Sequence, residues 1–319
     1  MNDKDRIIGG TLGVVVGDAL GVPVEFMPRK VLDKTPVKGM KGYGTHNQPA
    51  GTWSDDSSLT LCLADSLLQK GGYDPEDIAS KFRQWLTQGY WSARGKVFDV
   101  GFTTATAIRR TADGFPPTQA GLSTERDNGN GSLMRILPAA LYFRSVEIKI
   151  MLDRICKISS ITHGHPRSQL ACCIYGLLVD ELMNGMEKEA AYEQVCKGAF
   201  DAISGLNAGL DEEWEHFMIP FGGKLVSEPQ KHIPSGGYVV DTLTAATWCF
   251  LKHDSFEETV LAAVNLGEDT DTTAAVAGGL AGVYYGVDAI PREWTKVLAK
   301  RKQVEQIASD FAEEILSRK

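Results

Sequence analysis

The sequence has no excess of positive charge, since its 33 Lys and Arg residues are outnumbered by 41 Asp and Glu residues. The formal net charge of −8 excludes a protein that holds nucleic acid mainly by neutralising phosphates. An apolar share of 43% with 23% charged residues is typical of a globular chain and excludes disorder over most of the length. Flexible linkers and internal repeats are also lacking, so we expect one domain over residues 1–319.

Membrane-spanning and secretory patterns are lacking as well. The apolar stretch after the charged N-terminus is interrupted by glycines and does not resemble a secretory signal. The longest mostly apolar run, 274–287, is shorter than the ~20 residues that a transmembrane helix needs. None of the six cysteines forms a CxxC pair, which favours buried free thiols over structural disulfides or a thiolate zinc site. We therefore expect a cytoplasmic protein without a membrane partner.

Helical periodicity covers most of the chain, whereas alternating strand patterns are short and few. Apolar residues recur at i, i+3, i+4 and i+7 from Asp56 to Gly71, and Glu76–Gln88 carries a similar stripe. The sequence therefore predicts an all-α protein. Further helices are expected at 132–144, 146–160, 167–184, 187–204, 241–252, 255–266, 272–285 and 302–317, and irregular segments at about 24–55, 114–131 and 218–240. Irregular segments of this length are often functional.

Common nucleotide-binding and hydrolase motifs such as GxxxxGK[ST], GxGxxG, HExxH and GxSxG are absent. The sequence has instead two acidic clusters at expected helix starts, GTWSDDSS at 51–58 and GEDTDTT at 267–273. One or two acids in each can be explained as N-caps that favour the helix dipole. Adjacent carboxylates repel each other unless a cation lies near them, and hard divalent ions prefer carboxylate, hydroxyl and carbonyl oxygens. If the two clusters meet, they predict a metal site.

The residues that follow the second cluster are small. Ala275, Gly278, Gly279 and Gly282 lie on one side of the helix expected at 272–285. Because a glycine inside a helix costs roughly 1 kcal/mol relative to alanine, such a group indicates that another backbone approaches closely. An ordinary close helix crossing explains this stripe and is compatible with a site at the end of the helix.

Three other segments are weak signals when taken singly. GDALGVPVE at 17–25 has the pattern of a helix end that carries two acids. NGNGSLMR at 128–135 could present backbone N–H groups to a phosphate or form an Asn-Gly turn. THGHP at 162–166 places His163 and His165 at a helix junction, as ligands, stacking groups or structural caps. The pattern assigns no role to the remaining histidines, His46, His216, His232 and His253.

In their order along the chain and in their amino-acid sequences, these motifs resemble those of the ADP-ribosylglycohydrolase family. The resemblance implies a compact, orthogonally packed all-α domain with a central cleft that holds two divalent cations, Mg²⁺ or Mn²⁺. It extends from the first expected helix to near the last one. The matching segments are GDALGVPVE (17–25), GTWSDDSS (51–58), NGNGSLMRILP (128–138), THGHP (162–166), GGYVVDTL (236–243) and GEDTDTTAAVAGGLAGVYYG (267–286).

The resemblance also implies site residues. The family's metal ligands fall on Ser54, Asp55, Asp56, Asp269, Asp271 and Thr272, with Ser54 where many members have Thr. Its catalytic carboxylates fall on Glu25, Asp55 and Asp99, the last in the short motif FDVG at 98–101. Its phosphate-binding loop falls on Gly129, Asn130, Gly131 and Ser132, and its adenosine contacts on His163, Gly237 and Tyr238. Because the loop 24–50 is rich in Gly and Pro, we expect Glu25 on a mobile lid.

The activity implied by the resemblance is metal-dependent hydrolysis that removes ADP-ribose from a modified acceptor, with protein arginine as the first choice. An acidic protein has to hold the pyrophosphate with backbone N–H groups rather than with many lysines. Cleavage at the ribose carbon passes through an oxocarbenium-like state, while cations can orient the ribose and lower the pKa of a bound water. A carboxylate can carry the proton, and the sequence leaves open which carboxylate does so.

Two alternatives remain open at this level. The chain could hydrolyse another ADP-ribosyl linkage (to serine, in O-acetyl-ADP-ribose or to a nucleic-acid base), or it could be a non-catalytic relative that binds ADP-ribose. Acids expected near the cleft mouth, Asp18, Glu25 and Asp99, favour a cationic arginine acceptor. Trp53 before Ser-Asp-Asp also resembles the bacterial arginine-type enzymes. We expect a monomer whose partner is ADP-ribosylated protein or ADP-ribose, with nucleic acid only as a modified substrate.

Overall fold

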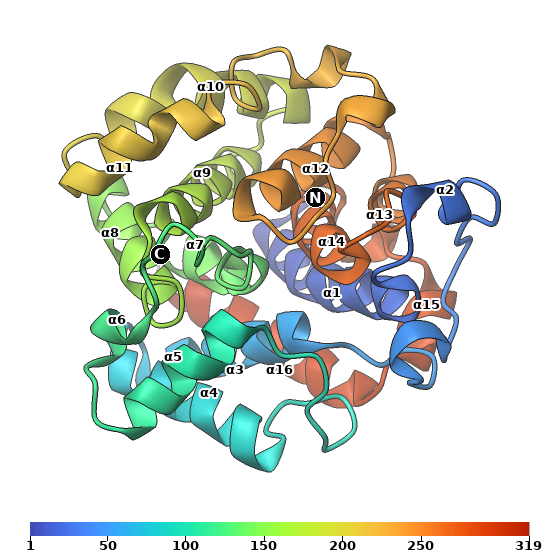
Figure 1. The fold of residues 1–319 in the computed structure, drawn as a ribbon, viewed down its shortest axis with the longest axis horizontal. Coiled ribbons are helices and arrows are strands. Elements are labelled where there is room, and N and C mark those ends of the chain that lie inside the picture. The colour runs from blue at the N-terminus through green and yellow to red at the C-terminus, as the bar shows by residue number, and fades with distance from the viewer. Residues whose placement is uncertain (319) are drawn as a thin grey trace.

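Two antiparallel helices form the centre of the protein, and glycine makes their contact very close. The computed structural model describes residues 1–318. In it, α1 (Asp3–Gly21) lies along α14 (Thr270–Tyr285) (Figure 1). A Cβ atom on Gly13 would lie 2.1 Å from the Gly278 carbonyl oxygen, and one on Gly278 would lie 2.3 Å from the Gly13 carbonyl oxygen. Since Cβ atoms do not approach carbonyl oxygens so closely, the stripe of small residues serves a close helix crossing.

The same contact repeats at successive turns of both helices. A Cβ atom on Gly17 would lie 2.0 Å from the Ala274 carbonyl oxygen, and one on Gly21 would lie 2.3 Å from the Cα atom of Asp271. Because residues four apart lie on one face of a helix, the glycine spacing keeps the two backbones in contact along their length. The C-terminal end of α1 therefore lies directly against the acidic motif that starts α14.

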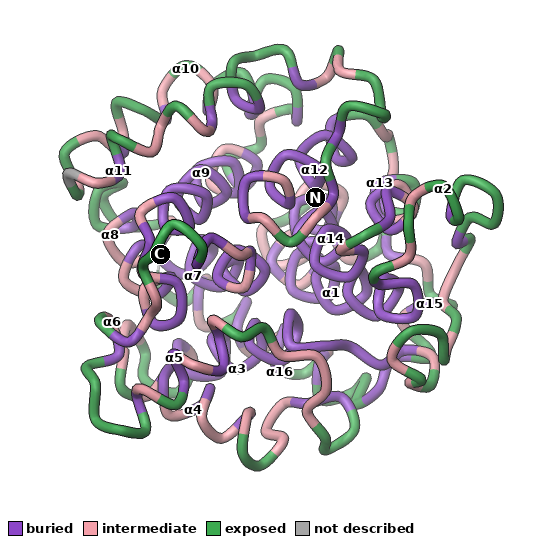
Figure 2. The backbone as a smooth tube through the Cα atoms, in the orientation of Figure 1, coloured by how far each residue is buried: buried purple, intermediate pink, exposed green. Residues whose placement is uncertain are grey.

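The remaining helices surround this pair. Figure 2 shows buried backbone concentrated at the centre, on α1, α14 and α9, and exposed backbone on α10 and the outer loops. Within residues 1–318 the β-type pairing consists of three isolated bridges, so the all-α prediction is confirmed. The other helices are α2 (Arg29–Leu32), α3 (Asp55–Lys70), α4 (Pro75–Gln88), α5 (Phe102–Ala112), α6 (Pro117–Ala120), α7 (Leu137–Phe143), α8 (Ile148–Ser159), α9 (Pro166–Met183), α10 (Lys188–Ile203), α11 (Ala208–Glu212), α12 (Val239–Lys252), α13 (Phe256–Asn265), α15 (Arg292–Val297) and α16 (Arg301–Ser317).

Most long helices lie within a few residues of the predicted bounds, but two differences have physical causes. The sequence pattern missed α5, because its buried face consists of small and hydroxyl-bearing residues such as Thr104 and Ala105 rather than a stripe of large apolar ones. The helix expected at 132–144 is divided into a 3₁₀ turn, Leu133–Arg135, and α7. Pro138 lies in the first turn of α7, the place where a missing backbone N–H costs nothing.

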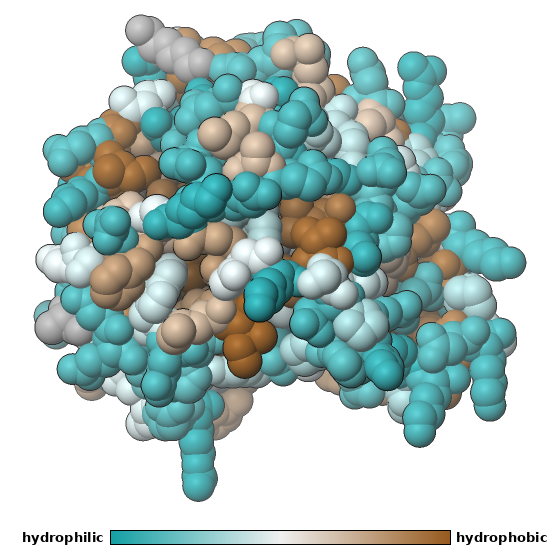
Figure 3. All heavy atoms as spheres, turned by 90° about the horizontal axis from the view of Figure 1, so that it is seen from above, coloured by the Kyte–Doolittle hydropathy of each residue, from teal (hydrophilic) through white to brown (hydrophobic). Residues whose placement is uncertain are grey.

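One cluster of buried apolar side chains extends from Ile7 to Ile315 and so includes both ends of the chain. By length and composition, the segment Asp3–Val24 is long and apolar enough to cross a membrane. From the sequence alone, only the apolar run 274–287 is considered for this role. However, 94% of the most apolar window of Asp3–Val24 is buried inside the protein, as in the central helix of a globular core. On the face drawn in Figure 3, hydrophilic residues predominate and hydrophobic ones form small separate patches.

The close contact of α1 with α14 gives a testable pair of substitutions. Gly278→Ala should lower the free energy of unfolding, because its methyl group has to displace a backbone carbonyl; we expect a loss of at least about 1–3 kcal/mol, the usual cost of overpacking. Gly198→Ala in α10 is the control, since a Cβ atom there meets nothing within 4 Å and should stabilise the helix by up to about 1 kcal/mol. Urea denaturation of both variants measures the difference, and equal free energies would contradict the packing described here.

Candidate functional site

The two acidic motifs meet where α3 and α14 begin. Ser54 is the N-cap of α3, and its hydroxyl group accepts a hydrogen bond from Asp56 N at 3.3 Å and donates one to Asp56 Oδ2 at 2.8 Å. Thr272 Oγ1, in the first turn of α14, donates to the same oxygen at 3.4 Å. Asp56 and Thr272 are 216 positions apart in the sequence. The structure therefore brings segments 51–58 and 267–273 together in one acidic floor.

Asp18, at the end of α1, lies beneath this floor with no exposed surface. Its carboxylate accepts hydrogen bonds from Ser54 N at 2.8 Å and from Ser57 N at 2.9 Å. A carboxylate in this place satisfies N–H groups that have no partner inside α3 and favours the helix dipole. Burial nevertheless raises the pKa of Asp18 to about 6. The expectation that Asp18 lies near the cleft mouth is wrong, because the residue caps α3 from below.

Three carboxylate oxygens of the floor have no hydrogen-bond partner among residues 1–318: Asp56 Oδ1, Asp269 Oδ1 and Asp271 Oδ2. The second oxygen of each acid is engaged; Asp269 Oδ2, for example, accepts from Asn130 Nδ2 at 2.7 Å, and Asp271 Oδ1 accepts from Thr272 N at 3.0 Å. A buried carboxylate oxygen without a partner is costly. The arrangement therefore fits groups that complete the coordination of these oxygens from outside the chain.

Carboxylates are also close enough together to share cations. One oxygen from each of Asp18, Asp56 and Asp271 lies within 4.8 Å of the others, and the same is true of Glu25, Asp269 and Asp271. Burial, followed by repulsion from neighbouring carboxylates, raises the pKa values of Asp56 and Asp271 well above the usual range. An all-oxygen donor set with this much repulsion fits hard divalent cations.

Glu25 reaches the floor from the start of the long irregular segment, and its side chain is 6% exposed. Its Oε2 atom is hydrogen-bonded to Nε2 of His46. Burial, and after it the charge of Asp99, raises the pKa of Glu25 to about 10. The next residue, Phe26, donates its N–H to the Glu268 carbonyl at 2.6 Å, which ties the start of this segment to the second acidic motif. The mobility expected for segment 24–50 stays a prediction.

The glycine-rich segment 128–132 forms the opposite wall. It pairs with 236–239 through an antiparallel bridge, in which Asn130 N donates to the Gly237 carbonyl oxygen at 3.1 Å. Unpaired N–H groups beside a glycine turn are a binding place for anionic phosphate. Within this described segment, the N–H groups of Gly129 and Gly131, which line the cleft, have no hydrogen-bond partner.

His163 packs directly against this glycine segment. A Cβ atom on Gly131 would lie 2.7 Å from Cε1 of His163, so the ring requires glycine there. Thr162 Oγ1 lies 2.8 Å from the His163 Nδ1 atom and holds the ring orientation. Burial, together with the charge of Arg135, lowers the pKa of His163 to about 3. The imidazole is therefore neutral at physiological pH and cannot act as a cation for phosphate.

Arg135 supplies a positive charge behind the same segment. It is fully buried, and its guanidinium group donates to the carbonyl oxygens of Gly131 and of Ile158, the latter at 3.2 Å. Its guanidinium carbon also lies 5.0 Å from the centroid of the Phe82 ring. Burial lowers the pKa of Arg135 to about 10, so the group stays charged at neutral pH. A buried cation that holds the Gly131 carbonyl fixes the turn whose glycines line the cleft.

These walls enclose a cleft of about 320 Å³. Exposed rings of Phe26 and Phe102 lie at its rim. Ten residues predicted from the sequence line the cleft: Glu25, Asp55, Asp99, Gly129, Asn130, Gly131, His163, Gly237, Asp269 and Thr272. The structure thus gathers most of the predicted site, while the role assigned to each residue stays a prediction.

Five predicted residues do not line the cleft. Ser54, Asp56 and Asp271 are buried in the floor below it. The Ser132 hydroxyl faces the core, where it accepts a hydrogen bond from Ser159 Oγ at 2.9 Å. Tyr238 lines a neighbouring hollow of about 710 Å³, and the Arg167 guanidinium lies 5.9 Å from its ring centroid.

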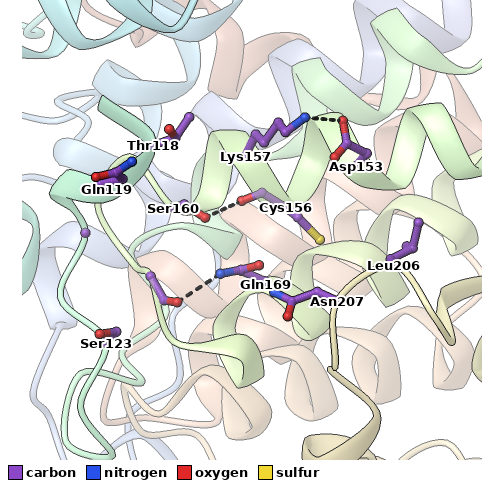
Figure 4. A pocket seen from close by; sticks show the side chains of 12 residues that line it. Thr118, Gln119, Ser123, Asp153, Cys156, Lys157, Ser160, Gln169, Leu206 and Asn207 are labelled. Carbon is purple, nitrogen blue, oxygen red and sulfur yellow. Dashed lines mark hydrogen bonds and ion pairs between the residues drawn. The ribbon is translucent and has the colours of Figure 1, made fainter. Parts of the chain in front are cut away.

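A further hollow, of about 490 Å³, lies behind the turn that carries His163 and is lined by other residues than the cleft (Figure 4). Among the described residues that line it, Asp153 is the only acidic one, and Lys157 pairs with it at 2.8 Å. The unpartnered carboxylate oxygens therefore single out the cleft rather than this hollow as the candidate site.

The sequence assigns no role to His46 or Arg135, and although it marks Asp18 as an acid near the cleft, it does not predict that Asp18 caps a helix. His46 hydrogen-bonds a residue 21 positions away, and Asp18 caps a helix that begins more than 30 positions later. Arg135 follows the glycine motif inside an expected helix, where an arginine is ordinary. A contact between distant segments leaves no periodicity or spacing to detect.

A family model described as ADP-ribosylglycohydrolase matches residues 1–319. The chain belongs to the ADP-ribosylglycohydrolase family. It is 32% identical over 310 residues to the ADP-ribosylarginine hydrolase Tri1 of Pseudomonas putida, which corresponds to 96% of this chain and 78% of that protein. It is 33% identical over 300 residues to the ADP-ribosyl-[dinitrogen reductase] glycohydrolase of Rhodospirillum rubrum, which corresponds to 92% of this chain and 90% of that protein.

A solved structure described as an ADP-ribosylglycohydrolase-related protein complex superimposes with a TM-score of 0.80 at 35% identity, over 98% of both chains. The family and the fold expected from the motifs are therefore confirmed. ADP-ribosylglycohydrolases are hydrolases of the metal-dependent type, and the acidic floor of this member could hold cations.

In this ADP-ribosylglycohydrolase chain, repulsion in the floor should make the metal-free protein less stable as the pH rises. The folded-state pKa is about 6 for Asp18 and about 10 for Glu25, against 3.8 and 4.5 as ordinary values. At a pH between the ordinary and the folded-state pKa of either group, the folded protein binds more protons than the unfolded chain. The free energy of unfolding therefore falls with rising pH. We expect the Tm of chelator-treated protein to fall from about pH 4 to about pH 8 and added Mg²⁺ or Mn²⁺ to restore it.

Asp56→Asn should flatten this pH dependence, because it removes one of the mutually repelling groups. Asp153→Asn is the control, since Asp153 is partly exposed and paired with Lys157 outside the cleft. A Tm of the chelator-treated protein that rises over this range, or the same slope for wild type and Asp56→Asn, would contradict the electrostatic account.

Proposed function

We propose that this chain hydrolyses the bond between ADP-ribose and an arginine side chain of a modified protein, with two divalent cations, Mg²⁺ or Mn²⁺, on the acidic floor. The proposal is carried by one juxtaposition: carboxylate oxygens without partners lie in and beneath the floor of a cleft whose opposite wall carries Gly129 and Gly131, and the N–H groups of these two glycines have no partner. One wall suits cations and the other suits a pyrophosphate. The names of the Tri1 and Rhodospirillum relatives support ADP-ribose removal, the former from arginine.

The residues that would hold the cations provide only oxygen atoms as ligands. When bound, the cations would orient the ribose hydroxyl groups and stabilise negative charge at the reacting oxygen. Aspartate and hydroxyl oxygens of this kind are the ligands that Mg²⁺ and Mn²⁺ prefer. The proposed set is Ser54, Asp55, Asp56, Asp269, Asp271 and Thr272.

The chain's own groups would position the substrate and move a proton. The N–H groups of segment 129–132 would bind the pyrophosphate, with the neutral ring of His163 beside them. Glu25, Asp55 and Asp99 line the cleft and are the carboxyl groups able to take a proton from the attacking water or give one to the leaving guanidine. Water and leaving group lie on opposite faces of the ribose carbon in a direct displacement, so two different groups can share these tasks.

Features of the cleft support a cationic acceptor. Its acids and the net charge of −8 attract a guanidinium group. Phe26 and Phe102, which are 62% and 78% exposed at the rim, could stack on such a cation. Trp53, by contrast, is buried and donates its Nε1–H to the Trp91 carbonyl oxygen at 3.2 Å. The resemblance to arginine-type enzymes at Trp53 therefore does not act through contact with the acceptor.

We further propose that the protein acts as a monomer in the cytoplasm, with ADP-ribosylated protein or ADP-ribose as its partner. The cysteine usage of the sequence supports a reducing compartment. Residues of this one chain line the cleft from its acidic floor to its glycine-rich wall.

The proposed acceptor is tested on two ADP-ribosyl peptides of matched sequence, one modified on arginine and one on serine. We expect faster release of ADP-ribose from the arginine peptide, and loss of the release in chelator with recovery on adding Mg²⁺ or Mn²⁺. Faster release from the serine peptide would overturn the arginine assignment but not the site. ADP-ribose binding without release from either peptide would identify a non-catalytic relative.

The proposed metal ligands are tested by Asp269→Asn. We expect Mn²⁺ affinity, measured by calorimetry, to fall by more than the ~10–100-fold that loss of an outer-sphere partner costs. Turnover should fall with it, while the helical circular dichroism spectrum stays unchanged. Asp153→Asn is the matched control and should retain both properties. Unchanged Mn²⁺ affinity in Asp269→Asn would remove this residue from the ligand set.

A further inference from the structure

A constrained turn holds His46 at the edge of the cleft. Tyr43 and Asn47, which flank it, have positive φ values of 66° and 51°, and Gly44 has φ 67°. A Cβ atom on Gly44 would lie 1.9 Å from the Pro23 carbonyl oxygen, so the turn is pressed against the start of the same segment. Non-glycine residues in the left-handed region are uncommon and cost energy. The fold therefore maintains a strained turn at this place.

The turn is bonded to Glu25 at two points. Thr45 Oγ1 donates to the Glu25 backbone carbonyl oxygen at 2.7 Å, and the His46 ring bonds the Glu25 carboxylate through Nε2 and Oε2. The side chains of His46 and Glu25 are 15% and 6% exposed. Both ends of Glu25, its backbone and its carboxylate, are thus held by consecutive residues of one turn.

Two aromatic rings hold the imidazole in its orientation. The centroid of the His46 ring lies 6.0 Å from that of Phe26 and 5.3 Å from that of Phe98. Phe98 immediately precedes Asp99, and one atom from each of Glu25, His46 and Asp99 lies within 4.8 Å of the others. The rings fix the direction of Nε2, and the hydrogen bond fixes one carboxylate oxygen of Glu25.

We propose that His46 is a positioning residue that holds the Glu25 carboxyl group against the acidic floor in its reactive orientation. The proposal rests on the proposed function, in which Glu25 moves a proton. With Oε2 held by His46, the other carboxylate oxygen of Glu25 is the one left to act in the cleft beside Asp269 and Asp271. His46 itself has no place among the residues that line the cleft, so it acts through Glu25 and not on the substrate.

Two substitutions separate the hydrogen bond from the packing of the ring. His46→Gln keeps an N–H donor at about the distance of Nε2 but loses the ring, whereas His46→Phe keeps a ring between Phe26 and Phe98 but loses the donor. We expect His46→Phe to lower kcat by about 100-fold, the cost of misplacing a catalytic group by about 1 Å, with little change in KM. His46→Gln should stay within a few-fold of wild type.

His232→Phe is the matched control, because His232 also bonds a glutamate, Glu228 at 3.2 Å, but on the surface outside the cleft. Its kcat and KM should equal those of wild type. The opposite order, an active His46→Phe and an impaired His46→Gln, would show a packing role and overturn the proposal. A loss confined to KM in His46→Phe would also overturn it.

A measurement that needs no acceptor keeps this test separate from that of the proposed function. In protein labelled with ¹⁵N-histidine, His46 should appear as the Nε2-protonated ring with a strongly downfield proton, and Glu25→Ala should abolish that signal. Absence of the signal in wild type would overturn the positioning role. A wild type that shows the signal but releases ADP-ribose from no peptide would refute the proposed reaction while leaving the His46–Glu25 geometry supported.

Discussion

The rest of the structure depends on the contact of two helix backbones without intervening side chains. Because α1 and α14 touch through glycine at successive turns, the last turn of α1 lies against the first turn of α14. Asp18 then lies under the start of α3, and Asp271 lies beside it. A single larger residue in the crossing would separate the two backbones and with them the acids at their ends. The positions of the acidic side chains in the floor are therefore set by the packing of α1 against α14.

That packing imposes an electrostatic cost that the chain does not remove by itself. Several carboxylates are buried within a few ångströms of one another, and their pKa values are raised by burial and mutual repulsion. Hydrogen bonds from Ser54, Thr272 and Asn130 satisfy one oxygen of Asp56 and Asp269 and leave the other open. Such an arrangement is stable only with positive charge from outside or with retained protons. The same cluster of buried carboxylates that destabilises the fold makes it suited to hold cations.

The opposite wall of the cleft differs in chemistry from the acidic floor. It presents backbone N–H groups of a glycine turn, and the exposed Arg126 also lines the cleft. The turn is kept in shape by the buried Arg135 behind it and by the His163 ring beside it. Rigid helices supply the floor, while irregular segments supply Glu25, Asp99 and the glycine turn. This division lets the cleft be polar although the helices under it form a continuous apolar core.

Sequence alone determined the helical class, most long helices, the family and the residues that the cleft gathers. Local periodicity, glycine spacing and acids at helix starts are short-range properties, so they can be read without coordinates. Only the tertiary structure decided that Asp18 caps α3 from below, that His46 bonds Glu25 and that Tyr238 faces a neighbouring hollow. It also decided that the Ser132 hydroxyl points into the core. The hydrogen bonds among these facts join residues 21 to 39 positions apart. How the helices pack decides these partners, and no local pattern encodes that packing.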